Sequence, residues 1–311
     1  MRIGNCKIEY LRYCRVEKEN CLGTVAKYQD ALNKIIAVIG DIEVLDINQN
    51  AILELKENMM EQGLSDSRRA LIISVLKNFL AYLKNFIGLQ VYDYSKIKIP
   101  KVRRKPVRIL TTQEIEWFIG QLPEITLKDK RFKALVALIS ICGARIAEIL
   151  GLRRNIAIDA REAIVCGKGG KFRPIYWDDQ ASYYLRLYQD ARPEWDRSEF
   201  LFGTINNGNY GGQWSKGDVN RSFRKWSTKL NKRIHCHLFR SSFLTNCVHE
   251  GMSLSAVSRA MGHSDIRTSM RYFAPMTDEQ TKETFHEYFR RQAMVDVKVN
   301  LEIAQKGGEG K

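Results

Sequence analysis

The sequence predicts a mainly α-helical protein with a small antiparallel β-sheet, and three observations predict it. Apolar residues in the first ninety positions recur with helical spacing. A later stretch, residues 132–142, is apolar almost all round, as expected of a helix buried inside a domain. Between residues 156 and 177, short runs of β-forming residues surround a glycine-rich turn, which is typical of a hairpin.

The first ninety residues predict three helices, each preceded by a residue that can cap its start. Thr24, Asp46 and Ser65 stand before apolar stripes with helical spacing. Their side-chain oxygens can accept hydrogen bonds from first-turn N–H groups. Gly63 ends the second of these helices. We therefore expect a helical domain over residues 1–95.

Residues 96–108 differ in composition and predict an extended linker between two domains. The segment has no acidic residue, and two prolines interrupt its basic residues, which are Lys96, Lys98, Lys101, Arg103, Arg104, Lys105 and Arg108. Proline and charge repulsion both disfavour a helix. An ordinary charged linker is the alternative to one that lies along a phosphate backbone. We favour phosphate contact through Lys101, Arg103, Arg104 and Lys105.

The charge balance favours a polyanionic partner. The 311 residues include 50 Lys and Arg against 35 Asp and Glu, a net charge of +15. Nucleic acid is favoured over an anionic membrane surface or a basic surface that only maintains solubility. Arg68 and Arg69 are further candidates for phosphate contact, because cations in the first turn of a helix oppose its dipole. Solvated arginines are the equal alternative.

The sequence contains no apolar run of the ~18 residues that a membrane span needs. Residues 1–13 also lack the apolar core of a secretory signal. The seven cysteines are scattered and include no CxxC pair, which is typical of free thiols in a reducing compartment. A zinc site from Cys6, Cys14 and Cys21 is the alternative, but their spacing matches no zinc finger. We expect a cytoplasmic protein without a membrane partner.

Residues 109–291 predict a second domain in which helices surround the small sheet. Thr111 and Glu114 form a capping box before its first helix. Residues 144–152 resume a helical pattern after the buried helix, and helices return after Asp178. Strands are expected at residues 156–158, 163–166 and 172–177, with a turn at 167–171.

Residues 292–311 predict a tail of a different character. From Val295 to Ile303 apolar and polar residues alternate strictly, which predicts a half-buried strand. A single strand is not stable alone. We therefore expect this strand to join a sheet edge of its own chain or of a neighbour.

Four stretches of the second domain carry side chains suited to catalysis. In chain order these side chains are Arg145, Glu148, Lys168, His237, Arg240, His263 and Tyr272. Taken alone, Arg145 and Glu148 are typical of a buried ion pair and Lys168 of a basic turn. His237 would suggest a structural or metal-binding role, and Tyr272 a packing tyrosine. Only their order and spacing together indicate chemistry.

These side chains, in this order and with this spacing, closely resemble those of the tyrosine recombinase (phage integrase) family, which includes the Xer recombinases. The family's boxes TGLRxxELLxL, GKGxKxR, HxLRHxFAT and LGHxxxxTTxxY are matched by residues 142–152, 167–173, 237–245 and 261–272. The resemblance covers about residues 105–285, and the first domain resembles the family's SAM-like core-binding domain more loosely. Ala144, Phe239 and Ser241 depart from the pattern, but none of these departures removes a group that must transfer a proton.

The resemblance implies an α+β catalytic domain that cuts DNA and holds it as a 3′-phosphotyrosine. Tyr272 would be the nucleophile, and Arg145 with Arg240 would bind the non-bridging phosphate oxygens. His237 would be the general base and Lys168 the acid for the leaving 5′-oxygen. His263 would hydrogen-bond the phosphate or support Tyr272, and Glu148 would orient Arg145 or His237.

Neither a metal ion nor ATP is expected as a cofactor. The sequence lacks a carboxylate cluster suited to Mg²⁺ and a Walker GxxxxGK[ST] motif, and a phosphotyrosine conserves the energy of the broken bond. Strand exchange requires several protomers on two DNA duplexes. The resemblance implies a tetramer in which C-terminal elements pass between neighbours, and the strand at 295–303 is our candidate for that element.

Two rival functions share part of this pattern. A type IB topoisomerase uses the same chemistry but rejoins the same strand, and the small first domain disfavours it. A DNA-binding protein that keeps the fold without cutting is disfavoured because every expected catalytic group is present. Both a mobile-element integrase and a chromosome-dimer resolver fit the sequence, and it does not specify a target site.

Overall fold

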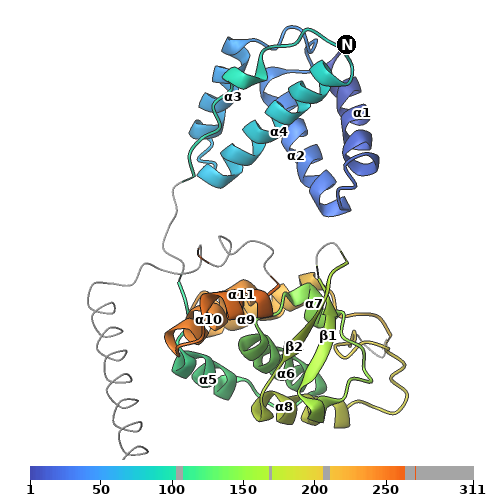
Figure 1. Ribbon diagram of the computed structural model, residues 1–311, viewed down its shortest axis with the longest axis vertical. Coiled ribbons are helices and arrows are strands. Elements are labelled where there is room, and N and C mark those ends of the chain that lie inside the picture. Colours follow the sequence, from blue (N-terminus) through green and yellow to red (C-terminus); the bar gives the residue numbers. More distant parts are fainter. Residues whose placement is uncertain (103–107, 168–169, 206–210, 263–269, 271–311) are drawn as a thin grey trace, which may run out of the picture. The chain divides into compact units, whose positions relative to one another are not determined.

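The computed structural model describes residues 1–102, 108–167, 170–205, 211–262 and 270. Two compact units make up the chain and divide between Lys105 and Pro106 (Figure 1). The mainly helical fold class with one small antiparallel sheet is confirmed. Several predictions fall outside the described residues, namely those for Arg103, Arg104, Lys105, Lys168, His263, Tyr272 and the strand at 295–303.

Four helices pack around the core of the first unit. They are α1 (Ile3–Val16), α2 (Leu22–Ile39), α3 (Gln49–Glu61) and α4 (Asp66–Asn85), followed by the short 3-10 helix η1 (Tyr94–Lys96). Tyr10 of α1 and Phe79 of α4 are fully buried and meet edge to face at 5.4 Å. Ile97 also packs into this core, so the beginning of the predicted linker belongs structurally to the first unit.

The predicted helix starts in this unit are right at one position and wrong at two. Ser65 caps α4, because its hydroxyl accepts the Arg68 N–H at 3.3 Å. Thr24 does not cap α2, which begins two residues earlier at Leu22. Asp46 does not cap α3 either, since Asn48 accepts the first-turn N–H groups of Asn50 and Ala51 at 2.9 and 3.1 Å.

Helix α1 was not predicted as a separate element, because its apolar stripe is narrow and half made of cysteine. Ile3, Cys6, Tyr10 and Cys14 lie along one face of the helix and are buried. Free cysteine behaves in such a place as a small apolar residue. Cys6 and Cys14 are buried, whereas Cys21 is exposed. Among the described residues, no group of His, Cys, Asp and Glu is placed to hold a metal ion.

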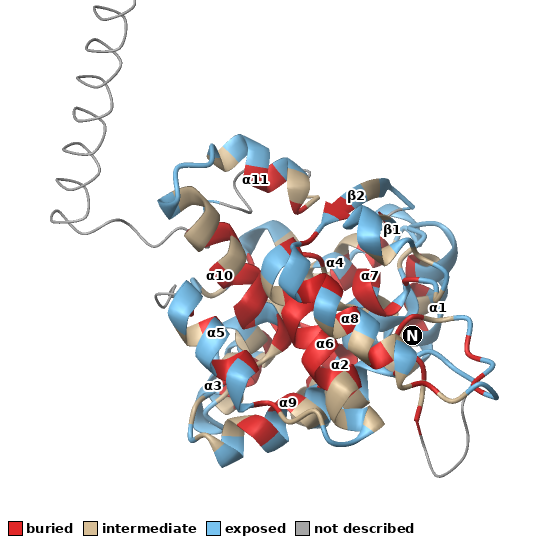
Figure 2. Ribbon diagram, turned by 90° about the horizontal axis from the view of Figure 1, so that it is seen from below, coloured by how far each residue is buried: buried red, intermediate tan, exposed pale blue. Residues whose placement is uncertain are grey.

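The second unit is built around α6, a helix buried along most of its length (Figure 2). It contacts helices α5, α7, α8 and α10 and strand β2. The elements are α5 (Thr112–Gln121), α6 (Leu127–Cys142), α7 (Ile146–Leu150), η2 (Ile158–Ala160), β1 (Glu162–Cys166), β2 (Phe172–Tyr176), α8 (Asp179–Asp190), α9 (Lys216–Lys229), α10 (Cys236–His249) and α11 (Leu254–Ala260). The predicted capping box of Thr111 and Glu114 is present at α5.

The sheet of this unit is the hairpin of β1 and β2. The strands are antiparallel, with Glu162 opposite Tyr176 and Cys166 opposite Phe172. Val165 and Ile175 face the core, each 2% exposed. The strand predicted at 156–158 is wrong, because the chain there enters the 3-10 helix η2. Ile156 and Ile158 pack against the core from this turn, so their alternation does not reflect a strand.

No helix among the described residues combines the length and apolar character needed to cross a lipid bilayer.

Gly143 lets α6 end directly against α10. Its φ of +57° is a left-handed conformation that favours glycine. A Cβ added there would lie 2.3 Å from the ring of Phe243 on α10. The carbonyl of Gly143 accepts a hydrogen bond from Arg240. The glycine therefore sets the distance between two elements that carry candidate site residues.

We predict that Gly143→Ala destabilises the protein by at least about 2 kcal/mol, because it combines a left-handed backbone with a steric clash. Urea denaturation followed by circular dichroism measures the change. The matched control is Gly120→Ala near the end of α5, where an added Cβ meets nothing within 4 Å. That substitution should stabilise slightly, by about 0.5 kcal/mol. Equal effects of the two substitutions would contradict the packing argument.

Candidate active site

An ion pair with a buried carboxylate lies where the chain enters α7. The Arg145 N–H donates to Glu148 Oε2 at 2.8 Å, and Arg145 Nη1 donates to Glu148 Oε1, also at 2.8 Å. The Glu148 side chain is 2% exposed, whereas that of Arg145 is 37% exposed. The carboxylate therefore holds the backbone and the guanidinium of Arg145 together, while part of the guanidinium still reaches solvent. Of the two alternatives for Glu148, the structure places it against Arg145.

A second arginine, Arg240, approaches from the first half of α10 and is buried. Its guanidinium donates to the carbonyl of Gly143, and its Nη2 donates to the carbonyl of Met261 at 2.8 Å. Arg145 Nη2 donates to the next carbonyl, that of Gly262, at 3.2 Å. Arg145 and Arg240, 95 residues apart in the sequence, therefore meet at the same short segment after α11.

A third arginine, Arg173 of β2, joins this cluster and was not singled out in the sequence. Its Nη2 donates to Glu148 Oε2 at 2.7 Å, and its Nη1 donates to the Ala260 carbonyl. Consecutive carbonyls at residues 260, 261 and 262 thus each accept from a different guanidinium. Carbonyls at the end of a helix carry partial negative charge, which stabilises nearby cations.

Glu148 remains ionised although it is buried. Burial alone would raise the pKa of its carboxyl. The Arg145 backbone N–H, the Arg145 guanidinium and the charge of Arg173 outweigh that effect and lower the pKa below its usual 4.5. Among the described residues, Arg145 and Arg173 both form their ion pair with this one carboxylate.

His237 lies in the first turn of α10, three residues before Arg240. Desolvation and the charges of Arg240 and His235 lower the pKa of His237 below 6.5. Its imidazole is therefore neutral at pH 7 and able to accept a proton. His235, which the sequence analysis did not identify, caps this helix by accepting the Leu238 N–H at Nδ1, 3.1 Å away.

The described residues next to Lys168 and His263 lie beside the same carboxylate and arginines. Gly167 precedes Lys168, and a Cβ added to it would be 3.3 Å from Glu148 Oε1. Gly262 precedes His263, and its carbonyl accepts from Arg145. Lys168, His263 and Tyr272 themselves lie outside the described residues.

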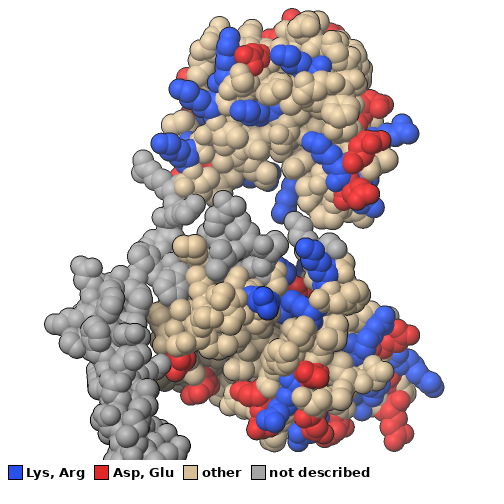
Figure 3. All heavy atoms as spheres, in the orientation of Figure 1, with Lys and Arg blue, Asp and Glu red and all other residues tan. Residues whose placement is uncertain are grey.

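The candidate DNA contacts of the first unit lie on and after α4. Arg69 pairs with Asp66 at 2.6 Å, so its charge is partly balanced within the helix. Arg68 is half-buried, and Lys101 is exposed. In the face shown in Figure 3, Lys and Arg side chains are interspersed with Asp and Glu on both units. In this view, the described Lys and Arg residues therefore form no continuous basic patch.

Comparisons with known proteins agree for both units. Residues 108–279 match the model of the phage integrase family, and residues 8–85 match that of the phage integrase N-terminal SAM-like domain. Tyrosine recombinase XerC of Haemophilus influenzae is 25% identical over 270 residues, covering 85% of this chain and 90% of that protein. Tyrosine recombinase XerC of Serratia marcescens is 28% identical over 276 residues, covering 85% and 88%.

Solved structures share the fold. The Tn1549 transposon integrase in complex with circular intermediate DNA aligns with a TM-score of 0.73 at 18% identity, covering 92% of this chain and 99% of that one. A λ integrase dimer bound to a COC′ core site aligns with a TM-score of 0.69 at 15% identity, covering 88% and 77%.

We predict that Glu148→Gln costs about 3 kcal/mol of stability at pH 7, because two guanidiniums lose their buried counter-charge. The sign follows from the lowered pKa of Glu148. Its carboxylate stabilises the fold above pH 4.5, and this contribution is lost as the pH falls through the lower pKa of the folded state. Urea denaturation at neutral and acidic pH should show the two proteins converging below pH 4.5. A difference that stays constant down to pH 3 would contradict this account.

Proposed function

The chain belongs to the phage integrase family and is a tyrosine recombinase that acts in site-specific DNA recombination; on this premise we propose that Arg145, Arg240 and His237 form part of its active site. The observation that carries the proposal is the meeting of two guanidiniums, from separate elements, at the segment just before His263. Such a cluster is suited to a phosphodiester, whose non-bridging oxygens gain negative charge during attack.

The two arginines bind the phosphate. A guanidinium presents N–H groups in a planar fork that matches two phosphate oxygens, which an ammonium group does not. Arg240 is rigidly held because it is buried and donates to two backbone carbonyls. Arg145 is more exposed and faces solvent from the surface of the site. Together they stabilise the charge of the transition state.

The proposed reaction is an exchange of one phosphodiester bond for another. The phenol oxygen of Tyr272 forms a bond to phosphorus as the bond to the 5′-oxygen of the DNA breaks. His237 takes the phenol proton, and its lowered pKa keeps it neutral for this step. Lys168 supplies a proton to the leaving 5′-oxygen, and His263 hydrogen-bonds the phosphate or supports Tyr272. In the joining step, a 5′-hydroxyl of the partner duplex attacks the phosphotyrosine.

Duplex DNA is the proposed partner of both units. Residues 1–95 act as the core-binding domain, 96–108 as the linker, 109–291 as the catalytic domain and 292–311 as the tail. Arg68, Arg69, Lys101, Arg103, Arg104 and Lys105 contact phosphates, so binding weakens steeply as salt increases. The DNA complexes of the Tn1549 and λ integrases support this partner. A cytoplasmic location fits a DNA substrate and seven cysteines outside any disulfide.

Strand exchange is proposed to need a tetramer on two duplexes. One active site cuts one strand, and an exchange between two duplexes requires four strands to be cut and rejoined. The strand predicted at 295–303 is the element that would pass to a neighbouring protomer, where it can extend a sheet edge.

We predict that the wild-type protein forms a covalent adduct with DNA and that Tyr272→Phe forms none, because the phenyl ring lacks the attacking oxygen. The substrate is a pool of duplexes randomised on both sides of a nick. The nick lets the short product diffuse away, so the cut strand cannot be rejoined. Adducts are separated in denaturing gels, and sequencing their DNA maps the cleavage site.

The control for this experiment is DNA binding by both proteins, measured before denaturation. Equal binding with an adduct only for the wild type supports a recombinase or a topoisomerase. A labelled partner duplex then separates these two, because only a recombinase joins it to the cut strand. Binding without any adduct would contradict the proposal and favour a protein that binds DNA without cutting it.

We predict that removing residues 294–311 weakens assembly on DNA but not binding of one protomer to a single site. The truncated protein loses the exchanged strand and keeps every proposed DNA contact. Mobility-shift titrations with the mapped duplex and sedimentation of the complexes measure the two properties separately. Normal formation of two-duplex complexes by the truncated protein would exclude the tail as the exchanged element.

A further inference from the structure

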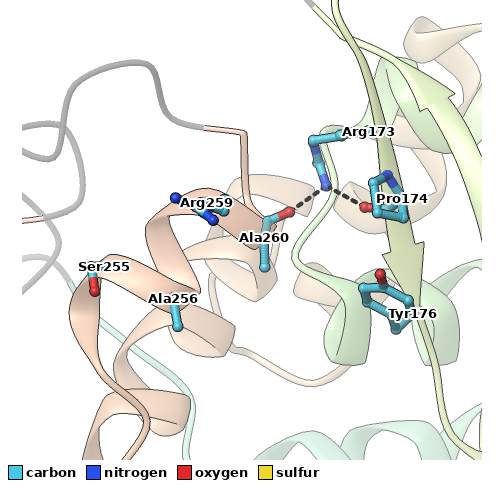
Figure 4. Close-up of a pocket in the computed structure, with 7 residues that line it drawn as sticks. All are labelled: Arg173, Pro174, Tyr176, Ser255, Ala256, Arg259 and Ala260. Carbon is cyan, nitrogen blue, oxygen red and sulfur yellow. Dashed lines mark hydrogen bonds between the residues drawn. The ribbon is translucent and has the colours of Figure 1, made fainter.

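Arg173 makes more connections between the site's elements than its place in the hairpin requires. It lies on β2, and its guanidinium donates to the carboxylate of Glu148. The same guanidinium donates to the carbonyl of Ala260, the last residue of α11 (Figure 4). A third hydrogen bond, at 3.3 Å, goes to the carbonyl of the adjacent Pro174. A single side chain thus links the hairpin whose two strands flank position 168, the carboxylate that holds Arg145, and the helix that leads to His263.

The gap that Arg173 bridges is not filled by apolar packing. A cavity of about 510 Å³ separates β2 from α11, and Tyr176, Ala256 and Arg259 line it together with Arg173. Side chains that pack closely resist displacement, but a cavity wall lacks those contacts. Burial fixes α11 against α10, where Val257 and Met261 pack on Leu244, whereas Arg173 supplies hydrogen bonds that join the end of α11 to the hairpin.

Gly262 shows that the backbone is shaped around Arg173. Its φ is +67°, and a Cβ added to it would lie 2.6 Å from Arg173 Nε. A side chain at position 262 would therefore displace the guanidinium. Arg173 Nε is buried and has no hydrogen-bond partner among the described residues. The arginine is thus held in place at the cost of one unsatisfied N–H, while its other donors connect separate elements.

We propose that Arg173 is a positioning residue of the recombination reaction, which fixes the carboxylate of Glu148 and the end of α11 so that Arg145 and Arg240 meet the scissile phosphate in their reactive geometry. This inference rests on the proposed function. Arg173 acts through Glu148 and through the Ala260 carbonyl. Its role requires the fork of an arginine, because one guanidinium nitrogen serves the carboxylate while the other serves the carbonyls.

The charged groups around Glu148 predict how the cleavage rate depends on pH when Arg173 is changed. Arg145 faces it from the start of α7 and Arg173 from β2, and Arg240 of α10 shares the α11 carbonyls with them. Near Arg173 and Arg240 lies the thiol of Cys142 at the end of α6; burial raises its pKa to about 12, so it is neutral. Removing the cation of Arg173 would raise the pKa of Glu148, because one of the charges that lower it is lost.

The test measures single-turnover cleavage of the mapped nicked duplex at saturating protein, together with the Kd for the same duplex. Arg173→Met should slow cleavage about 100-fold with the Kd changed less than about two-fold, because a small displacement of the reacting groups has effects of this size. Its rate should also fall earlier than the wild-type rate as the pH is lowered, because Glu148 without the Arg173 cation takes up a proton at a higher pH. Arg173→Lys keeps the charge but not the fork, so it should retain the wild-type pH profile at a rate about 10-fold lower.

Arg192→Lys is the matched control. Arg192 is buried in the same unit and pairs with Asp196 at 2.6 Å, and its other hydrogen bonds go to residues 189–201. This variant should lower the melting temperature while leaving the cleavage rate and its pH profile unchanged. If Arg173→Met does not fold, the cleavage rate of Arg173→Lys still tests the proposal, because this variant retains the charge.

Two results would overturn the inference. Cleavage by both Arg173 variants at the wild-type rate, with an unchanged pH profile, would show that Arg173 does not position the site. Loss of rate and DNA binding in proportion, with no recovery in Arg173→Lys, would show a purely structural role. Absence of any adduct from the wild type is a separate outcome, which would instead remove the proposed function and with it the reaction that Arg173 serves.

Discussion

The buried carboxylate of Glu148 is the interaction on which the rest of the site depends. It accepts hydrogen bonds from the Arg145 backbone, the Arg145 guanidinium and the Arg173 guanidinium. A charge removed from water is tolerated only when its partners are close and well oriented. Those partners come from the start of α7 and from β2, so pairing the carboxylate also fixes these two elements relative to each other.

The second constraint is the repulsion among three guanidiniums in one place. Their positive charge is offset by one carboxylate and by three consecutive carbonyls at the end of α11. This leaves the cluster with an excess of positive charge and with donors already oriented by the fold. Such a site is prepared for an anionic group before it binds, and little reorganisation is needed as charge develops on a phosphate. The neutral imidazole of His237 in the first turn of α10 fits the same field, because neighbouring cations disfavour its protonation.

The sequence predicts a feature of the fold or site well when all the residues that form it lie close together in the chain. The Arg145–Glu148 pair follows from spacing of three within one helical turn, and the hairpin follows from strands on either side of a glycine-rich turn. Arg173 was missed because its partners lie on other elements, 25 and 87 positions away, and its only sequence signal was the last basic position of the hairpin box. Helix starts failed at Thr24 and Asp46, since α2 begins after Cys21 without any side-chain cap, and Asn48 caps α3 in place of Asp46. The strand predicted at 156–158 failed because three alternating residues are too few to separate a strand from a packed turn.

In the proposed mechanism, Glu148 organises the arginines for the reaction rather than for holding DNA. The most direct measurement is the first-order rate of covalent adduct formation by Glu148→Gln in preformed complexes with the nicked duplex, compared with the affinity of the same complexes. We expect a rate lower by about 100-fold at nearly unchanged affinity, because the glutamine no longer fixes both guanidiniums. A wild-type rate in those complexes, or a loss confined to affinity, would contradict it.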